Sequence, residues 1–170
     1  MTNKNFKVKN GLDVDAVADV ITVTAGVANL SGTATAATYS DLAERFAADA
    51  SYDAGTVVAL GGTEEITASA QEGSESVFGV VSGEHQAAFK MNGGAGTDAT
   101  HPYVAMAGRV QVKLIGTITK GDRLIASSTA GVARRATTDE CTAFNVIGRA
   151  LESKTSTGLG EVLCFVTAKS

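Results

Sequence analysis

Tryptophan is absent from this sequence of 170 residues, proline and cysteine are scarce, and aromatic residues make up only 5% of the chain. The two cysteines, Cys141 and Cys164, are too few for a disulfide framework and do not have the spacing of metal ligands. We expect both to be free thiols, with Cys164 in the core. No apolar run approaches the roughly 18 residues that cross a membrane, and the polar opening Met1–Asn10 lacks the apolar region of a signal peptide. We therefore expect synthesis in a cytoplasm and no membrane partner.

Clusters of basic charge are also missing. The formal net charge is −4, and the only adjacent basic pair is Arg134-Arg135. Because nucleic-acid binding depends on Lys and Arg side chains that neutralise phosphates, we expect no nucleic-acid partner. One acidic cluster is interleaved with Ser, Ala and Gly, which favours a solvated loop over a carboxylate site: Glu64, Glu65, Glu72 and Glu75.

Motifs of catalysis and cofactor binding are missing as well. The sequence has neither a Gly-x-Ser-x-Gly nucleophile elbow nor a Gly-rich phosphate-binding loop, so we expect no catalytic residues and no cofactor. His85 and His101 have no cysteine or acidic residue at a metal-binding spacing and are expected at the surface. Gly93–Asp98 matches the start of a calcium-binding nonapeptide, but such motifs work by repetition and this one occurs once. It is expected to be an exposed loop without metal.

What the sequence does contain is glycine and short apolar runs. Its 19 glycines, with only 19% charged residues, are typical of a β protein with many turns. Residues 56–170 are therefore expected to form an antiparallel β-sandwich or barrel, in an all-β fold. The expected strands are Thr56–Leu60, Val77–Ser82, Ala87–Phe89, Tyr103–Met106, Arg109–Ile115, Arg123–Ala126, Asn145–Leu151 and Glu161–Thr167.

The clearest alternation lies in the run from 109 to 115. Val110, Val112 and Leu114 are separated by polar residues. Side chains at every second position point to one face of a strand, so we expect these three to face the core and their neighbours to face solvent.

A short helix is predicted just before this domain, over residues 39–49. Thr38 and Asp41 have the spacing of a capping box, and apolar residues then recur at helical intervals: Leu42, Ala43, Phe46 and Ala47. Residues 39–55 would thus be a linking helix and a turn. Tyr39, Phe46 and Tyr52 cluster around it and could bind a saccharide, although their position favours packing of the preceding segment onto the domain.

Residues 1–38 alternate apolar and polar residues in short pieces separated by Gly. Such an arm buries too little surface by itself and carries unpaired strand edges, so we expect it to intertwine with other copies and to serve oligomerisation and attachment. The residues expected at this contact are Phe6, Val8, Leu12, Val14, Val20, Ile21 and Val23.

Several of these segments resemble a module of tailed-bacteriophage virion proteins. The strongest is Tyr39–Phe46, followed by the Tyr-x-x-Gly-Thr-Val-Val of Tyr52–Val58. Further matches follow the order of the same module: Asn5–Leu12, Gly79–Ser82, Gly108–Lys113, Lys120–Leu124 and Ile147–Glu152. Each motif alone is a β pattern with a Gly turn, but together they cover most of the chain. The sequence is thus similar to tail-fibre and head-decoration or head-fibre proteins.

This resemblance implies a non-enzymatic virion structural protein that is made in the host cytoplasm. A short chain that ends with its domain favours a homotrimeric capsid-decoration (cement) protein or short head fibre, whose partners are its own copies and the major capsid protein or another virion protein. The alternative is a tail-fibre or baseplate component involved in host attachment. A carbohydrate-degrading or proteolytic enzyme is the least favoured reading.

Overall fold

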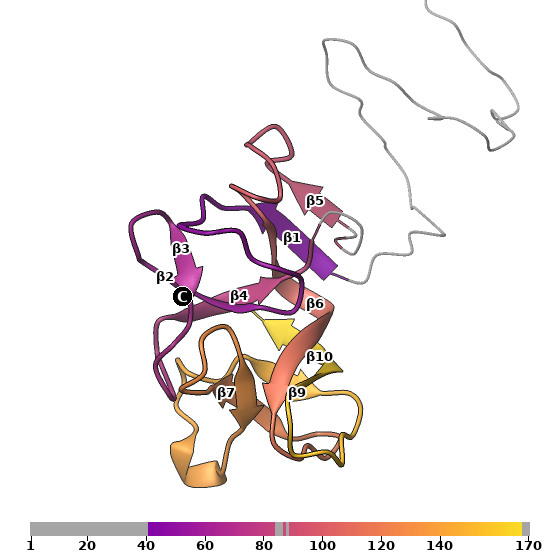
Figure 1. Cartoon of the computed structure of the whole chain (residues 1–170). Coiled ribbons are helices and arrows are strands. Elements are labelled where there is room, and N and C mark those ends of the chain that lie inside the picture. Colours follow the sequence, from indigo (N-terminus) through magenta and orange to yellow (C-terminus); the bar gives the residue numbers. More distant parts are fainter. Residues whose placement is uncertain (1–40, 84–86, 88, 168–170) are drawn as a thin grey trace, which may run out of the picture. The chain divides into compact units, whose positions relative to one another are not determined.

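The longest strand, β6 (Tyr103–Ile115), takes part in both parts of the fold, which are a barrel and a second layer of strands (Figure 1). The computed structural model describes residues 41–83, 87 and 89–167, which belong to the compact unit Ala37–Ser170. The described residues form strands and one 3₁₀ turn, η1 (Thr138–Glu140), and they include no longer helix. The predicted all-β class is therefore confirmed.

Nine strands accompany β6 in a single ten-stranded sheet. They are β1 (Asp41–Arg45), β2 (Val57–Leu60), β3 (Ile66–Ala68), β4 (Val77–Val81), β5 (Phe89–Met91), β7 (Arg123–Ala126), β8 (Ala133–Arg135), β9 (Gly148–Ala150) and β10 (Gly160–Thr167).

The C-terminal half of β6 belongs to a closed barrel, seen in the lower half of Figure 1. β10 pairs with β6 and β9, β9 pairs with β7, β7 with β8, and β8 returns to β6. These contacts are antiparallel except for the parallel β6–β8 pair. Closure satisfies the backbone groups that an open sheet would leave at its edges.

The barrel interior follows the alternation predicted for β6. Val110, Val112 and Leu114 are buried, and Val112 lies opposite Val162 of β10. Cys164 is fully buried in the same cluster, as predicted. Each fully buried side chain of the size of Val or Leu contributes about 1.5–3 kcal/mol, so this cluster is a main source of the domain's stability.

The N-terminal half of β6 supports a second layer. It pairs with β4 and β1, and β4 pairs with β2. Gly108 has a φ of 115°, which is accessible to glycine but strained for other residues. It lies where β6 changes from pairing with β1 to pairing mainly with β10. A separate cluster of Val58, Ile66, Val81 and Val104 forms the core of this layer.

The predicted helix over 39–49 is wrong, because residues 41–45 form the strand β1. Alternate residues of β1 are buried, and the strand pairs with β6 on one side and with β5 on the other. An isolated helix of this length is marginal in water, whereas a strand at this position gains two sets of ladder hydrogen bonds and buries Ala43. Residues 41–55 therefore include a strand of the domain and do not form the predicted helical linker.

Other strand predictions differ in detail. The two runs Tyr103–Met106 and Arg109–Ile115 form one continuous strand, and the strand expected at Ala87–Phe89 lies at Phe89–Met91. The short strands β3 and β8 were not predicted. Their three-residue length leaves too little alternation to detect.

Candidate functional site

The predicted oligomerisation residues cannot be placed. Phe6, Val8, Leu12, Val14, Val20, Ile21 and Val23 all lie outside the described residues, as do Tyr39 and His85. The role of the arm therefore remains a prediction.

The Gly-rich segment at 92–101 is an exposed loop whose acidic residue already has a cationic partner. Asp98 lies 2.9 Å from the guanidinium of the buried Arg45, which also donates a hydrogen bond of 2.5 Å to the carbonyl of His101. The guanidinium carbon lies 4.1 Å from the centre of the Tyr103 ring, at a cation–π distance. Asp98 therefore helps to fasten this loop to β1 and β6.

Within the described part of the chain, no three His, Cys, Asp or Glu residues come close enough to hold a metal ion. Among those residues there is also no helix long and apolar enough to span a membrane. His101 has its Nδ1 atom 3.1 Å from the hydroxyl of Thr100.

Both cysteines are free, as predicted. Burial raises the pKa of the Cys164 thiol to about 12, and the negative charge of Glu152 adds to the effect. Cys164 is therefore protonated at neutral pH and is a poor nucleophile or metal ligand.

The aromatic residues after β1 belong to the core of the second layer. Phe46 and Tyr52 pack against the cluster of Val58, Ile66, Val81 and Val104. The rings of Phe46 and Phe78 meet edge to face with centroids 5.0 Å apart. These contacts support a packing role for Phe46 and Tyr52. The packing lies within the β domain, whereas the sequence had suggested packing of the preceding segment onto the domain.

All four residues of the predicted acidic cluster are exposed, and two of them form separate contacts with other parts of the domain. Glu65 accepts a hydrogen bond of 2.7 Å from the backbone amide of Ala47. Glu72 pairs with Arg134 across 2.6 Å. Glu64 and Glu75 are exposed and have no ion pair within the described residues.

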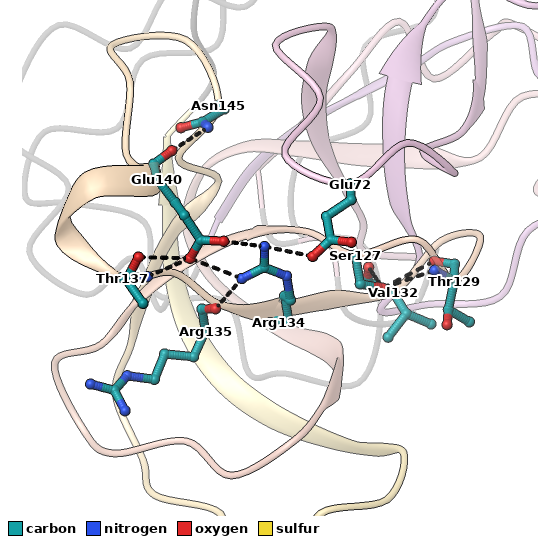
Figure 2. A network of polar contacts seen from close by, with 9 residues as sticks. All are labelled: Glu72, Ser127, Thr129, Val132, Arg134, Arg135, Thr137, Glu140 and Asn145. Carbon is teal, nitrogen blue, oxygen red and sulfur yellow. Dashed lines mark hydrogen bonds and ion pairs between the residues drawn. The ribbon is translucent and has the colours of Figure 1, made fainter.

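Arg134 is the centre of a polar cluster that joins the barrel to the loop before β4 (Figure 2). Its guanidinium contacts Glu72 on that loop and forms hydrogen bonds of 3.1 Å and 2.5 Å to the carboxylate of Glu140 in η1. The backbone amide and the hydroxyl of Thr137 donate to the same carboxylate. The cluster therefore fixes the loop after β8 against the second layer, which is a structural role.

The Arg134 hydrogen bonds, followed by those from Thr137, lower the pKa of Glu140 from 4.5 to about 2. A carboxyl group with a lowered pKa stabilises the fold fully above its unfolded pKa, and this stabilisation is lost as the pH falls from about 4.5 towards 2.

We expect the substitution Glu140→Gln to lower the urea midpoint of unfolding at pH 7. We also expect the urea midpoint of this variant to decline less between pH 5 and pH 2 than that of the wild-type protein. Asp139→Asn, at the exposed neighbouring position, is the control. An unchanged pH dependence in Glu140→Gln would contradict this assignment.

The described surface includes at least two hollows. The first, of about 290 Å³, lies between the 51–54 turn, Ser82 and Pro102. The second, of about 320 Å³, lies beside Thr137 and contains Arg135 paired with Asp122 at 3.4 Å. Neither brings a nucleophile and a base together in the manner of an acyl-transfer site.

The outer face of the barrel carries the most distinctive set of exposed residues. Strand register places Arg123 opposite Arg149, Arg149 opposite Phe165, and Phe165 opposite Arg109, on four neighbouring strands. All four side chains are exposed, and Phe165 is 47% exposed. We call this set the arginine row. It could not be found in the sequence, because its members are brought together only by strand pairing.

Comparisons with known proteins are sparse. No model of a known protein family matches the chain, and no curated protein matches its sequence. One solved structure with a similar arrangement is the crystal structure of the N base of the head fibre protein gp8.5 of bacteriophage phi29. The two chains share 19% identity over 76% of this chain and 97% of that chain, with a TM-score of 0.42. A similarity this distant does not establish a common function.

Proposed function

We propose that the chain is a non-enzymatic structural protein of a tailed-bacteriophage virion. In this proposal it is a homotrimeric capsid-decoration (cement) protein or short head fibre on the particle surface. Its partners are its own copies and the major capsid protein or another virion protein.

This proposal rests on the ordered series of segments that resemble motifs of virion proteins. Four of them fall on connected parts of the domain: Gly79–Ser82 on β4, Gly108–Lys113 on β6, Lys120–Leu124 at the turn into β7, and Ile147–Glu152 around β9. Strand pairing links β4 to β6, β6 to β10, and β10 to β9, with β9 next to β7. Three of these motifs thus lie on strands or turns of the barrel and the fourth lies on β4, a direct neighbour of β6, which supports a common module.

Trimer formation is proposed for the arm. If its short alternating segments form strands, their unpaired edges would be covered by other copies of the chain about a threefold axis. The β domain, with its closed barrel, supplies the stable body that the arm would attach to the particle.

A capsid surface is favoured over the tail for one structural reason. The described residues fold into a barrel with a second layer, and a body of this kind suits a cap or short projection better than an extended fibre. A tail-fibre or baseplate component involved in host attachment remains the alternative.

The proposal predicts a trimer that is located on the head. Sedimentation of the purified protein at micromolar concentration is expected to give three times the 17.2 kDa mass of the chain. Imaging of intact virions with the protein labelled is expected to place the label on capsids. A monomer would contradict the trimer, and label confined to tails would favour the alternative.

A further inference from the structure

Charge is distributed unevenly along the β domain. Residues 46–83, which include β2, β3 and β4, contain six carboxylates and no Lys or Arg. Residues 103–154, which include most of the barrel, contain eight Lys and Arg and four carboxylates. One part of the domain is therefore acidic and another is basic, although the whole chain is only weakly acidic.

The arginine row is an exposed part of this basic region. Neighbouring strands are about 4.8 Å apart, so the row of Arg123, Arg149, Phe165 and Arg109 extends over roughly 14 Å. None of its arginines has an ion pair within the described residues. Arg123 and Arg149 lie directly opposite each other, and like charges in this position repel. An acidic partner would relieve that repulsion and would cover Phe165.

A complementary surface exists on the same chain, which we call the acidic edge. Leu60 at the end of β2 is 53% exposed. Its amide donates to Ser76, and the next amide, of Gly61, donates to Glu65. Leu60 therefore lies between the segments that carry the exposed Glu64 and Glu75. The acidic edge therefore has an apolar residue, Leu60, between carboxylates. The arginine row has an apolar residue, Phe165, between arginines, so the two surfaces are complementary in charge.

We propose that the arginine row of one subunit binds the acidic edge of a neighbouring subunit, with Phe165 against Leu60. The strands β10 and β3 are the two ends of the main strand path, and Figure 1 shows them in different parts of the fold. Two different surfaces in contact make a head-to-tail interface, and repetition of that interface forms a ring where the rotation between neighbouring subunits closes, as a homotrimer requires. The inference rests on the proposed function, because the homotrimer sets the number of subunits in the ring at three.

Charge reversal tests this arrangement. The double variants Arg109→Glu/Arg149→Glu and Glu64→Lys/Glu75→Lys place like charges against each other, so each is expected to weaken trimer assembly on the order of tenfold or more. Combining all four substitutions restores opposite charges and is expected to restore the trimer. Lys120→Glu and Asp139→Lys are matched reversals at exposed positions outside both surfaces and should leave assembly unchanged. Circular dichroism establishes that each variant is folded.

Sedimentation over a range of concentrations measures the trimer population. Raising NaCl from about 0.05 M to about 0.5 M is also expected to weaken assembly of the wild-type protein, because salt screens exposed charges. If the wild-type protein is a monomer, the trimer of the proposed function is overturned together with the ring. If it is a trimer that neither double variant weakens, or that the combined variant fails to restore, only the head-to-tail contact is overturned. Loss of virion binding by a row variant that remains trimeric would instead assign the row to another virion protein and overturn the contact between copies.

Discussion

Deletion of residues 1–38 is expected to leave a soluble β domain that no longer docks on the virion and trimerises weakly or not at all. The first described strand, β1, begins at Asp41, and the buried apolar core starts at Ala43, so the deletion leaves the domain intact. In the arm, each apolar side chain fully buried between chains would contribute about 1.5–3 kcal/mol, less the cost of ordering the arm. Loss of these contacts should therefore affect assembly far more than folding.

Virion binding and sedimentation measure this effect, and thermal unfolding followed by circular dichroism measures the stability of the truncated domain. A longer deletion, of residues 1–46, removes β1 as well and should abolish folding, because β6 and β5 both lose a partner strand. Full occupancy of virions by the 1–38 deletion would place the anchor in the β domain and contradict the role proposed for the arm.

The substitution Ile21→Asp provides a point test of the same contact. It would introduce a charge into the proposed apolar contact between chains, and an unpaired buried charge is costly. Its effect on assembly should therefore resemble that of the deletion. Asn29→Asp adds the same charge at a polar position of the arm and should have little effect.

Replacement of Gly148 by alanine is expected to destabilise the domain strongly. A Cβ atom at Gly148 would lie 2.2 Å from the carbonyl oxygen of Phe165 and 2.9 Å from the Cα atom of Val166. Both contacts are with the backbone of β10, so relief requires β9 and β10 to move apart where they close the barrel. The free energy of unfolding should fall by about 3 kcal/mol, at the upper end of the usual cost of overpacking.

Gly158→Ala is the matched control, because a Cβ atom there would have no neighbour within 4 Å. It should change the free energy of unfolding by less than about 0.5 kcal/mol. Urea unfolding of the full-length proteins at one fixed concentration compares the two variants. Equal stabilities would mean that β9 and β10 do not approach each other as closely as the structure indicates.

The alternation of apolar and polar residues was sufficient to predict much of the barrel. Val110, Val112 and Leu114 face the interior, and the runs at 123–126 and 161–167 correspond closely to β7 and β10. Successive side chains of a strand point to opposite faces, so a strand with one face in the core has an apolar residue at every second position. The alternation can be detected in the sequence when the strand is long enough.

The segment around Leu42 shows where local pattern is misleading. Its apolar residues recur at helical intervals, yet it forms a strand in which Asp41 and Arg45 are buried. Arg45 is accommodated because Asp98, His101 and Tyr103 surround its guanidinium, and all three are distant in the sequence. Contacts with β5 and β6 outweighed the local helical preference.

The all-β class and most of the barrel strands could be predicted from the sequence, because they depend on side chains only a few residues apart. Contacts between distant segments were needed to establish that β1 is a strand and that β8 and β10 close the barrel on β6. The same contacts place Arg123, Arg149, Phe165 and Arg109 in one exposed row. These features depend on pairing between segments far apart in the chain, whose register is set by the fit of the whole core and leaves no local signal in the sequence.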